Sequence, residues 1–102
     1  MASIMRSWHG RTPTGVAGEY LALMTPRALA DYRSVPGNLG AWVLSRRDGD
    51  ITHVTTLSLW SSWDAIAAFA GTPPDAARYY DFDPRYLLEL EPTVTHWEVH
   101  GG

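Results

Sequence analysis

Residues 51–70 read ITHVTTLSLWSSWDAIAAFA, and this stretch decides the fold. Its first half is apolar and rich in β-branched residues, which predicts a strand over Ile51–Trp60. Ser61 or Ser62 then caps a helix that runs to about Ala70 and ends at a glycine. A strand that passes directly into a capped helix indicates a domain built from alternating strands and helices.

The residues before this stretch predict the other strands and the helix of the N-terminal half of the chain. Asp48-Gly49 is typical of a hairpin turn and joins the strand at 51–60 to an earlier strand over Leu39–Arg46. A first strand is predicted over Ile4–Gly10, followed by a helix over Val16–Met24 whose buried face includes Leu23. We expect Pro26 to interrupt this helix, so that a second piece, Arg27–Arg33, follows at an angle.

The C-terminal third carries weaker patterns. Thr72-Pro73-Pro74 is predicted to open a short helical segment over Asp75–Tyr80. The acidic stretch Asp81–Asp83 is then most simply a solvated loop. A helical turn is expected over Arg85–Leu90, and a last strand over Thr93–His100.

The order strand, helix, strand, strand, helix, strand predicts an α+β, ferredoxin-like domain over residues 1–102. Its four-stranded antiparallel sheet has the first and third strands at the centre and both helices on one face. The strands are nevertheless apolar on both faces, since Trp42 and Leu44 alternate with Ala41 and Val43. A second apolar face needs a cover, so the pattern predicts a homodimer through the sheet.

Composition excludes several classes of function. The chain has no cysteine, which excludes disulfides and thiolate metal sites and fits a reducing, cytoplasmic compartment. The net charge is −3 and no basic stripe is visible, so a nucleic-acid partner is not expected. No apolar run is long enough for a membrane, no secretory leader is visible, and phosphate-loop and dinucleotide motifs are absent.

Histidine and tryptophan on the predicted strands are the first candidates for chemistry. His53 lies near the start of a central strand, where it is either a general base in a pocket or a sheet histidine satisfied by a neighbour. His9, on the other central strand, has the same two interpretations. Trp60 ends its strand before a helix, so it either stacks on a planar ligand or anchors the start of the helix.

A second group of candidates follows the second helix. Arg78, Tyr79 and Tyr80 are expected to border a cleft between that helix and the sheet, and the two phenols can bond a polar ligand group or form an aromatic clamp. Trp63 and Phe69, on the helix itself, are most simply core residues.

Three stretches of this sequence together resemble the antibiotic biosynthesis monooxygenase superfamily, also called the dimeric α/β-barrel family. They are Val35-Pro36-Gly37-Asn38, the segment Leu57–Ile66 that runs from strand into helix, and Thr93–Val99 near the end. The likeness covers essentially the whole domain. It implies a dimeric α/β barrel and, for cofactor-free members, oxidation of phenolic polyketides to quinones in secondary metabolism.

The resemblance also assigns roles residue by residue. Cofactor-free members use a Trp at the end of the third strand, matched by Trp60, and an Asn four residues earlier, where this chain has Thr56. Heme-degrading members carry a Trp and a His where this chain has Phe69 and Tyr79, so heme degradation is disfavoured. Polyketide cyclases of the same barrel carry a strand histidine in a setting similar to Thr52-His53-Val54, but their partner Tyr and second His are absent.

The leading hypothesis is a cofactor-independent oxygenase acting on an aromatic, polyketide-like molecule between sheet and helices. Trp60, His53 and Tyr80 are the expected catalytic residues, with Trp60 stacking on the substrate and His53 accepting its phenolic proton. Substrate binding is expected from Tyr79, Arg78, His9, Thr56 and Phe69. Strict alternation puts His53 and Trp60 on opposite faces, which a β-bulge would reconcile. The alternatives are a cyclase or isomerase with His53 as base, and a non-catalytic dimer that binds a small molecule; no cofactor or metal is expected.

Overall fold

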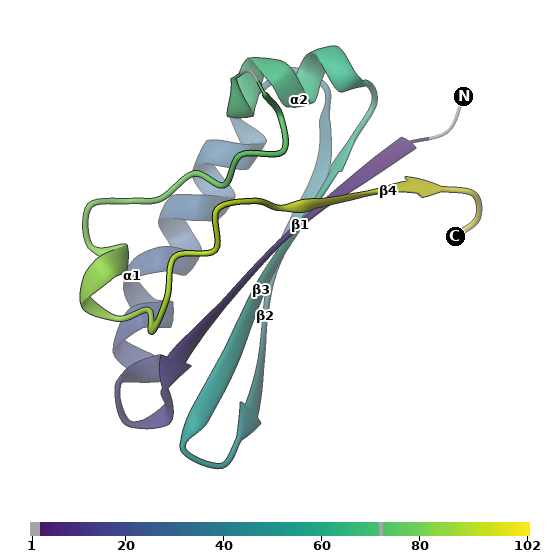
Figure 1. Ribbon diagram of the computed structural model, residues 1–102. Coiled ribbons are helices and arrows are strands. Elements are labelled where there is room, and N and C mark those ends of the chain that lie inside the picture. Colours follow the sequence, from purple (N-terminus) through teal and green to yellow (C-terminus); the bar gives the residue numbers. More distant parts are fainter. Residues whose placement is uncertain (1–2, 72) are drawn as a thin grey trace.

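The computed structural model describes residues 3–71 and 73–102 (Figure 1). Its elements are β1 (Ser3–Pro13), α1 (Thr14–Arg33), β2 (Asn38–Asp48), β3 (Ile51–Trp60), α2 (Trp63–Ala70), a 3₁₀ turn over Asp83–Arg85, and β4 (Thr95–Val99). Within the described part, no helix is both long enough and apolar enough to cross a membrane.

The four strands form one antiparallel sheet in the order β2-β3-β1-β4. Figure 1 shows α1 and α2 on the same side of this sheet. The predicted α+β, ferredoxin-like architecture is therefore confirmed, with the first and third strands at the centre. β1 and β3 pair without a shift from Ile4 opposite Trp60 to Pro13 opposite Ile51, whereas β2 has one irregularity near Gly40.

Burial alternates strictly along the two central strands, because successive side chains point to opposite faces. Every second residue from Ile4 to Thr12 is buried, and so is every second residue from Thr52 to Trp60. The stripe of α1 that packs on this face is spaced three or four residues apart and consists of Ala17, Tyr20, Met24, Ala28 and Tyr32. The core thus lies between α1, α2 and one face of the sheet.

The prediction that Pro26 divides the first helix is wrong. α1 is continuous from Thr14 to Arg33 with Pro26 inside it. Both Pro26 and Ala22, whose carbonyl loses its amide donor at this proline, are exposed, so water can take the missing place. The buried stripe keeps its spacing across the proline and holds the two halves in line, while Leu23, expected to be buried, is 46% exposed.

The short helix predicted over Asp75–Tyr80 is also wrong, and Thr72 at its opening lies outside the described residues. This segment is extended because its backbone pairs with the residues before β4. The amide of Ala77 donates to the carbonyl of Pro92 (3.0 Å), and that of Val94 donates to the carbonyl of Asp75 (2.8 Å). The expected turn over Arg85–Leu90 is replaced by the 3₁₀ turn at 83–85, and the last strand is shorter than predicted.

The start of α2 is fixed as the sequence indicates. The Ser62 hydroxyl accepts a hydrogen bond from the amide of Ala65 at 3.1 Å, so Ser62 is the N-cap. Gly37 packs against this first turn with a positive φ of 96°, and a Cβ atom there would lie 2.6 Å from the Cβ of Ala65. The glycine is required both by its backbone conformation and by this close approach.

We predict that Pro26→Ala stabilises the protein by about 1–3 kcal/mol, because the new amide can donate to the carbonyl of Ala22 on an exposed part of α1. Urea denaturation at fixed protein concentration measures the change in the free energy of unfolding. Pro36→Ala, in the turn before β2, is the matched control and should give no such gain. Loss of stability in Pro26→Ala would contradict the prediction.

Candidate functional site

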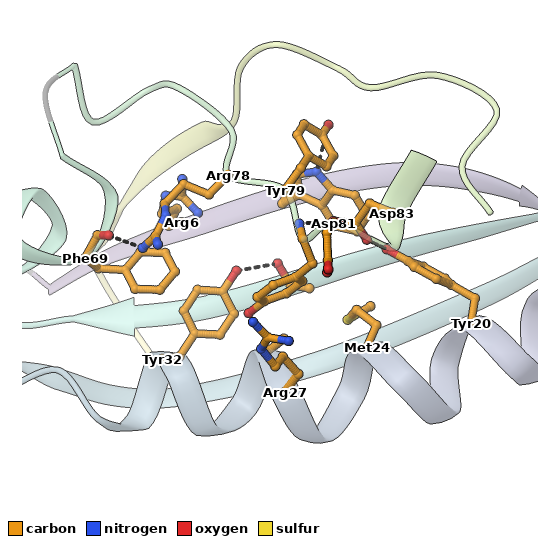
Figure 2. Close-up of a pocket in the computed structure, with 14 residues that line it drawn as sticks. Arg6, Tyr20, Met24, Arg27, Tyr32, Phe69, Arg78, Tyr79, Asp81 and Asp83 are labelled. Atoms are coloured by element: carbon orange, nitrogen blue, oxygen red, sulfur yellow. Dashed lines mark hydrogen bonds between the residues drawn. The ribbon is translucent and has the colours of Figure 1, made fainter. Parts of the chain in front are cut away.

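A cavity of about 370 Å³ lies between α1, the sheet and the segment after α2 (Figure 2). Side chains from both central strands, both helices and residues 78–83 line it. They are Arg6, Trp8 and Thr56 from the sheet, Tyr20, Met24, Arg27, Ala28 and Tyr32 from α1, Phe69 from α2, and Arg78, Tyr79, Tyr80, Asp81 and Asp83 from the segment that follows. Its volume is in the range of small-molecule sites.

One end of the cavity is built around the ring of Phe69. The guanidinium carbons of Arg6 and Arg78 lie 5.4 and 4.7 Å from its centroid, at distances typical of cation–π contacts. Arg78 also donates to the backbone carbonyl of Phe69. Tyr32 packs against the same ring at 4.7 Å between centroids. Two positive charges are therefore concentrated at this end.

Arg6 is the more unusual of the two cations, because its side chain is buried on a central strand. The residue is only 3% exposed. Its Nη2 donates to the carbonyl of Ala76 at 3.1 Å, and its Nε is buried without a hydrogen-bond partner. Burial lowers the pKa of Arg6, and the neighbouring charge of Arg78 acts in the same direction.

Four phenols surround the remaining space, and their hydroxyls are held in place. Tyr32 and Thr56 share a hydrogen bond of 3.0 Å between their hydroxyls, and Tyr80 donates to a carboxylate oxygen of Asp31 at 2.6 Å. Burial raises the pKa of Tyr80, so this phenol stays protonated at neutral pH and acts as a donor.

Tyr79 closes the side nearest β1. Its hydroxyl accepts from the indole of Trp8 at 3.2 Å and donates to the backbone carbonyl of Glu91 at 2.7 Å. Burial also raises the pKa of Tyr79. The ring is thereby tied both to the central strand and to the segment before β4.

Asp83 supplies a buried carboxylate. It is 3% exposed and accepts from the hydroxyl of Tyr20 at 2.8 Å and from the amide of Tyr80 at 2.6 Å. Burial raises the pKa of Asp83 and of Tyr20. The expectation of a fully solvated acidic loop at 81–83 is therefore wrong for Asp83, although Asp81 is exposed.

Five of the eight site residues expected from the sequence line this cavity: Thr56, Phe69, Arg78, Tyr79 and Tyr80. Trp60 does not. It is fully buried behind the cavity wall, packs on Phe69 and Tyr32, and donates from its indole to Ser58 at 2.8 Å. The expected stacking of Trp60 on a ligand is thus corrected to support of the residues that do line the cavity.

His53 and His9 lie on the opposite, open face of the sheet. The regular pairing of β1 with β3 contains no bulge that could turn His53 toward Trp60. The two histidines bond each other at 2.9 Å, His9 bonds the Glu91 carboxylate at 2.6 Å, and Asp48 lies 3.9 Å from His53. They line a separate hollow of about 210 Å³, so the expectation that His53 or His9 shares a pocket with the tyrosines is wrong.

Sequence reasoning missed Arg6, Tyr20, Tyr32 and Asp83. A signal existed for Arg6, which lies between Ile4 and Trp8 on one strand face and places a charge in an apolar stripe. Tyr20 and Tyr32 share the helical stripe of α1 and looked like ordinary core. Nothing local marks Asp83, because its burial depends on how the segment between α2 and β4 folds back over the helix.

The structure is similar over nearly its whole length to several solved structures of known proteins. It matches a putative antibiotic biosynthesis monooxygenase from Bacillus cereus with a TM-score of 0.72 and 11% identity, over 100% of this chain and 97% of that one. SnoaB, a cofactor-independent oxygenase from Streptomyces nogalater, matches with a TM-score of 0.58 and 18% identity, over 100% and 95%. A putative antibiotic biosynthesis monooxygenase from Nitrosomonas europaea gives 0.64 and 15%, over 98% and 89%.

No protein-family model and no curated protein matches the sequence. At these identities the structural matches show the fold, which this chain shares over its whole length with proteins described as antibiotic biosynthesis monooxygenases. They confirm the fold that the three quoted stretches of sequence implied.

The raised pKa of Asp83 predicts a pH-dependent contribution to stability. Between the ordinary aspartate pKa and the raised one, the folded protein holds a proton on Asp83 that the unfolded chain has released. The free energy of unfolding therefore falls as pH rises through this window. Relative to Asp83→Asn, the wild-type protein should lose stability in urea denaturation as the pH rises above the ordinary aspartate pKa of about 4. A difference that stays constant or grows with pH would contradict this.

Proposed function

We propose that this protein is a cofactor-independent oxygenase that binds a planar phenolic, polyketide-like molecule in the cavity beneath α1. The observation that carries the proposal is the combination of aromatic walls with fixed phenol and guanidinium donors in one cavity. The shared fold with SnoaB supports the reaction type by analogy of fold.

The cavity residues suit a flat molecule that carries several oxygens. Trp8, Phe69 and Tyr80 offer apolar ring surface, while Arg78 and Thr56 offer polar groups near its edges. Thr56 stands where the resembled oxygenases have an asparagine. A hydroxyl can donate one hydrogen bond and accept two, so Thr56 can accept from Tyr32 and still donate to a substrate oxygen.

The reaction draws its electrons from the substrate itself. An ionised phenol is electron-rich enough to pass an electron to O₂. One oxygen atom then becomes bonded to a ring carbon, and the other leaves as water with the two hydrogens of that carbon. A ring CH₂ and O₂ thus become C=O and H₂O. The guanidinium groups near Phe69 favour the ionised phenol, because they place positive charge where negative charge develops.

The phenolic proton needs an acceptor inside the cavity, and His53 is on the other face of the sheet. We assign this role to Asp83, acting through Tyr20, whose hydroxyl donates to the carboxylate at 2.8 Å. Burial raises the pKa of Asp83, which makes it a stronger base than a solvated aspartate. Because His53 does not line this cavity, the geometry gives no support to a cyclase that uses His53 as its base here.

Metal-free, flavin-free protein should therefore consume one O₂ for each anthrone-type phenol that it converts to the quinone. Asp83→Asn should lower the rate by about 10²-fold or more, because the base is lost. Asp50→Asn, an exposed carboxylate in the β2–β3 turn, is the matched control and should keep the rate. An oxygen electrode and absorbance of the product measure both changes.

Three results would contradict the oxygenase. Binding of the phenols without any turnover would indicate a non-catalytic small-molecule binder. A product isomeric with the substrate, formed without oxygen uptake, would indicate a cyclase. A rate that requires added metal would exclude cofactor independence.

We further propose that the open sheet face pairs with a second copy of this chain. Large apolar side chains project from it on three strands: Trp42 and Leu44 are 47% and 46% exposed on β2, and Trp97 is 57% exposed on β4. Leu57 and Leu59 lie between them on β3. Contiguous apolar surface of this kind is typical of protein–protein interfaces.

Leu44→Glu should shift the protein from dimer to monomer in sedimentation velocity, since it places a charge in the proposed interface. Leu23→Glu is a control of equal exposure, because Leu23 is also 46% exposed but projects from α1. That variant should remain dimeric. A wild-type protein that is monomeric at micromolar concentration would overturn the proposal.

A further inference from the structure

The buried guanidinium of Arg6 lacks an anionic partner. Among the described residues, no carboxylate lies within the 4.0 Å that defines an ion pair with it. After burial, the groups that act on its pKa are the phenol of Tyr32, which favours the charged guanidinium, and Arg78, whose like charge disfavours it. A charge that is 97% removed from water is normally paired, because burial without a partner is costly.

The contacts that Arg6 does make account for only part of its hydrogen-bonding capacity. One terminal nitrogen holds the carbonyl of Ala76, and the ring of Phe69 lies beneath the guanidinium. Its Nε remains without a partner. If Arg6 only anchored the loop at Ala76, a neutral side chain with a single hydrogen-bond donor would be enough. The remaining donor and the positive charge therefore point to a group that arrives from outside.

We infer that Arg6 is the anchor for an anionic oxygen attached to an aromatic ring, either a carboxylate or an ionised phenol. The inference rests on the proposed function and deepens it by naming the substrate class as aromatic anions. Arg6 lines the cavity, and the guanidinium of Arg78 contacts the same Phe69 ring (Figure 2). A planar acid can accept from guanidinium nitrogens, while its rings contact the aromatic walls.

The walls argue for an aromatic anion over a small inorganic one. The cavity of about 370 Å³ is much larger than one phosphate or sulfate, and tryptophan, phenylalanine and tyrosine rings line it together with Arg6. Apolar ring surface contributes nothing to the binding of a small, strongly hydrated anion. It does contribute to a molecule in which one charged oxygen sits on a ring system.

Isothermal titration under nitrogen tests the anchor without turnover, with a hydroxynaphthoate and its methyl ester as the probes. The wild-type protein should bind the acid at least about tenfold more tightly than the ester, as expected for a charge-assisted contact. Arg6→Met should abolish this preference, whereas Arg6→Lys, which keeps the charge, should retain part of it. Arg27→Met removes an exposed charge at the same cavity and should retain the preference.

A second measurement separates an anchor from a structural role. Replacing an unpaired buried charge by an apolar side chain is often neutral or stabilising, so Arg6→Met without ligand should melt no lower than the wild type. A naphthol added to each protein shows by absorbance whether binding favours the ionised phenol. The wild type should increase the ionised fraction and Arg6→Met should not.

Three results would overturn the inference: equal binding of acid and ester by the wild type, an unchanged preference in Arg6→Met, or loss of the preference only in Arg27→Met. Oxygen uptake is measured separately in air. Charge-dependent binding without oxygen uptake would leave the anion anchor and remove the oxygenase. Oxygen uptake with equal binding of acid and ester would support the oxygenase and overturn the anion anchor.

Discussion

The uninterrupted pairing of β1 with β3 is the constraint on which the rest of the structure depends. Because side chains alternate between the two faces of a sheet, a slip of one residue would exchange every buried side chain for an exposed one. The register that is present puts Arg6, Trp8 and Thr56 beneath the helices and His9 and His53 on the open face. The register of these two strands alone therefore places the cavity and the histidine pair on opposite faces of the sheet.

Much of the fold could be predicted because its signals are local. The Asp48-Gly49 turn, the Ser62 cap and the alternation along β3 each act within a few residues, and the structure confirms all three. The failures occur where a distant partner decides. Pro26 is tolerated because the buried stripe of α1 packs on the sheet across it, and residues 75–77 are extended because residues 92–94 pair with them.

Part of the candidate site could likewise be predicted from local signals, and part of it could not. Tyr79 and Tyr80 could be placed near a cleft because they follow a clear break, and Phe69 because it ends a helix against the sheet. The position of Trp60 in sequence left open whether it stacks on a ligand or anchors a helix, and the packing of Phe69 against it cannot be inferred from spacing. Asp83 accepts from the amide of Tyr80 nearby, but its other partner is Tyr20, sixty-three residues earlier, and no local window of sequence contains that residue.

Glu91 gives the two faces of the sheet a common element. Its backbone carbonyl accepts from Tyr79 in the cavity wall, while its carboxylate bonds His9 on the open face. Displacement of the Tyr79 hydroxyl would remove a hydrogen bond from the same residue whose carboxylate bonds His9. Thermodynamic linkage is reciprocal: if a ligand in the cavity changes the free energy of binding at the open face, binding at the open face changes the free energy of occupying the cavity by the same amount. Glu91 is thus a residue that contacts both the cavity wall and the histidine pair on the other face of the sheet.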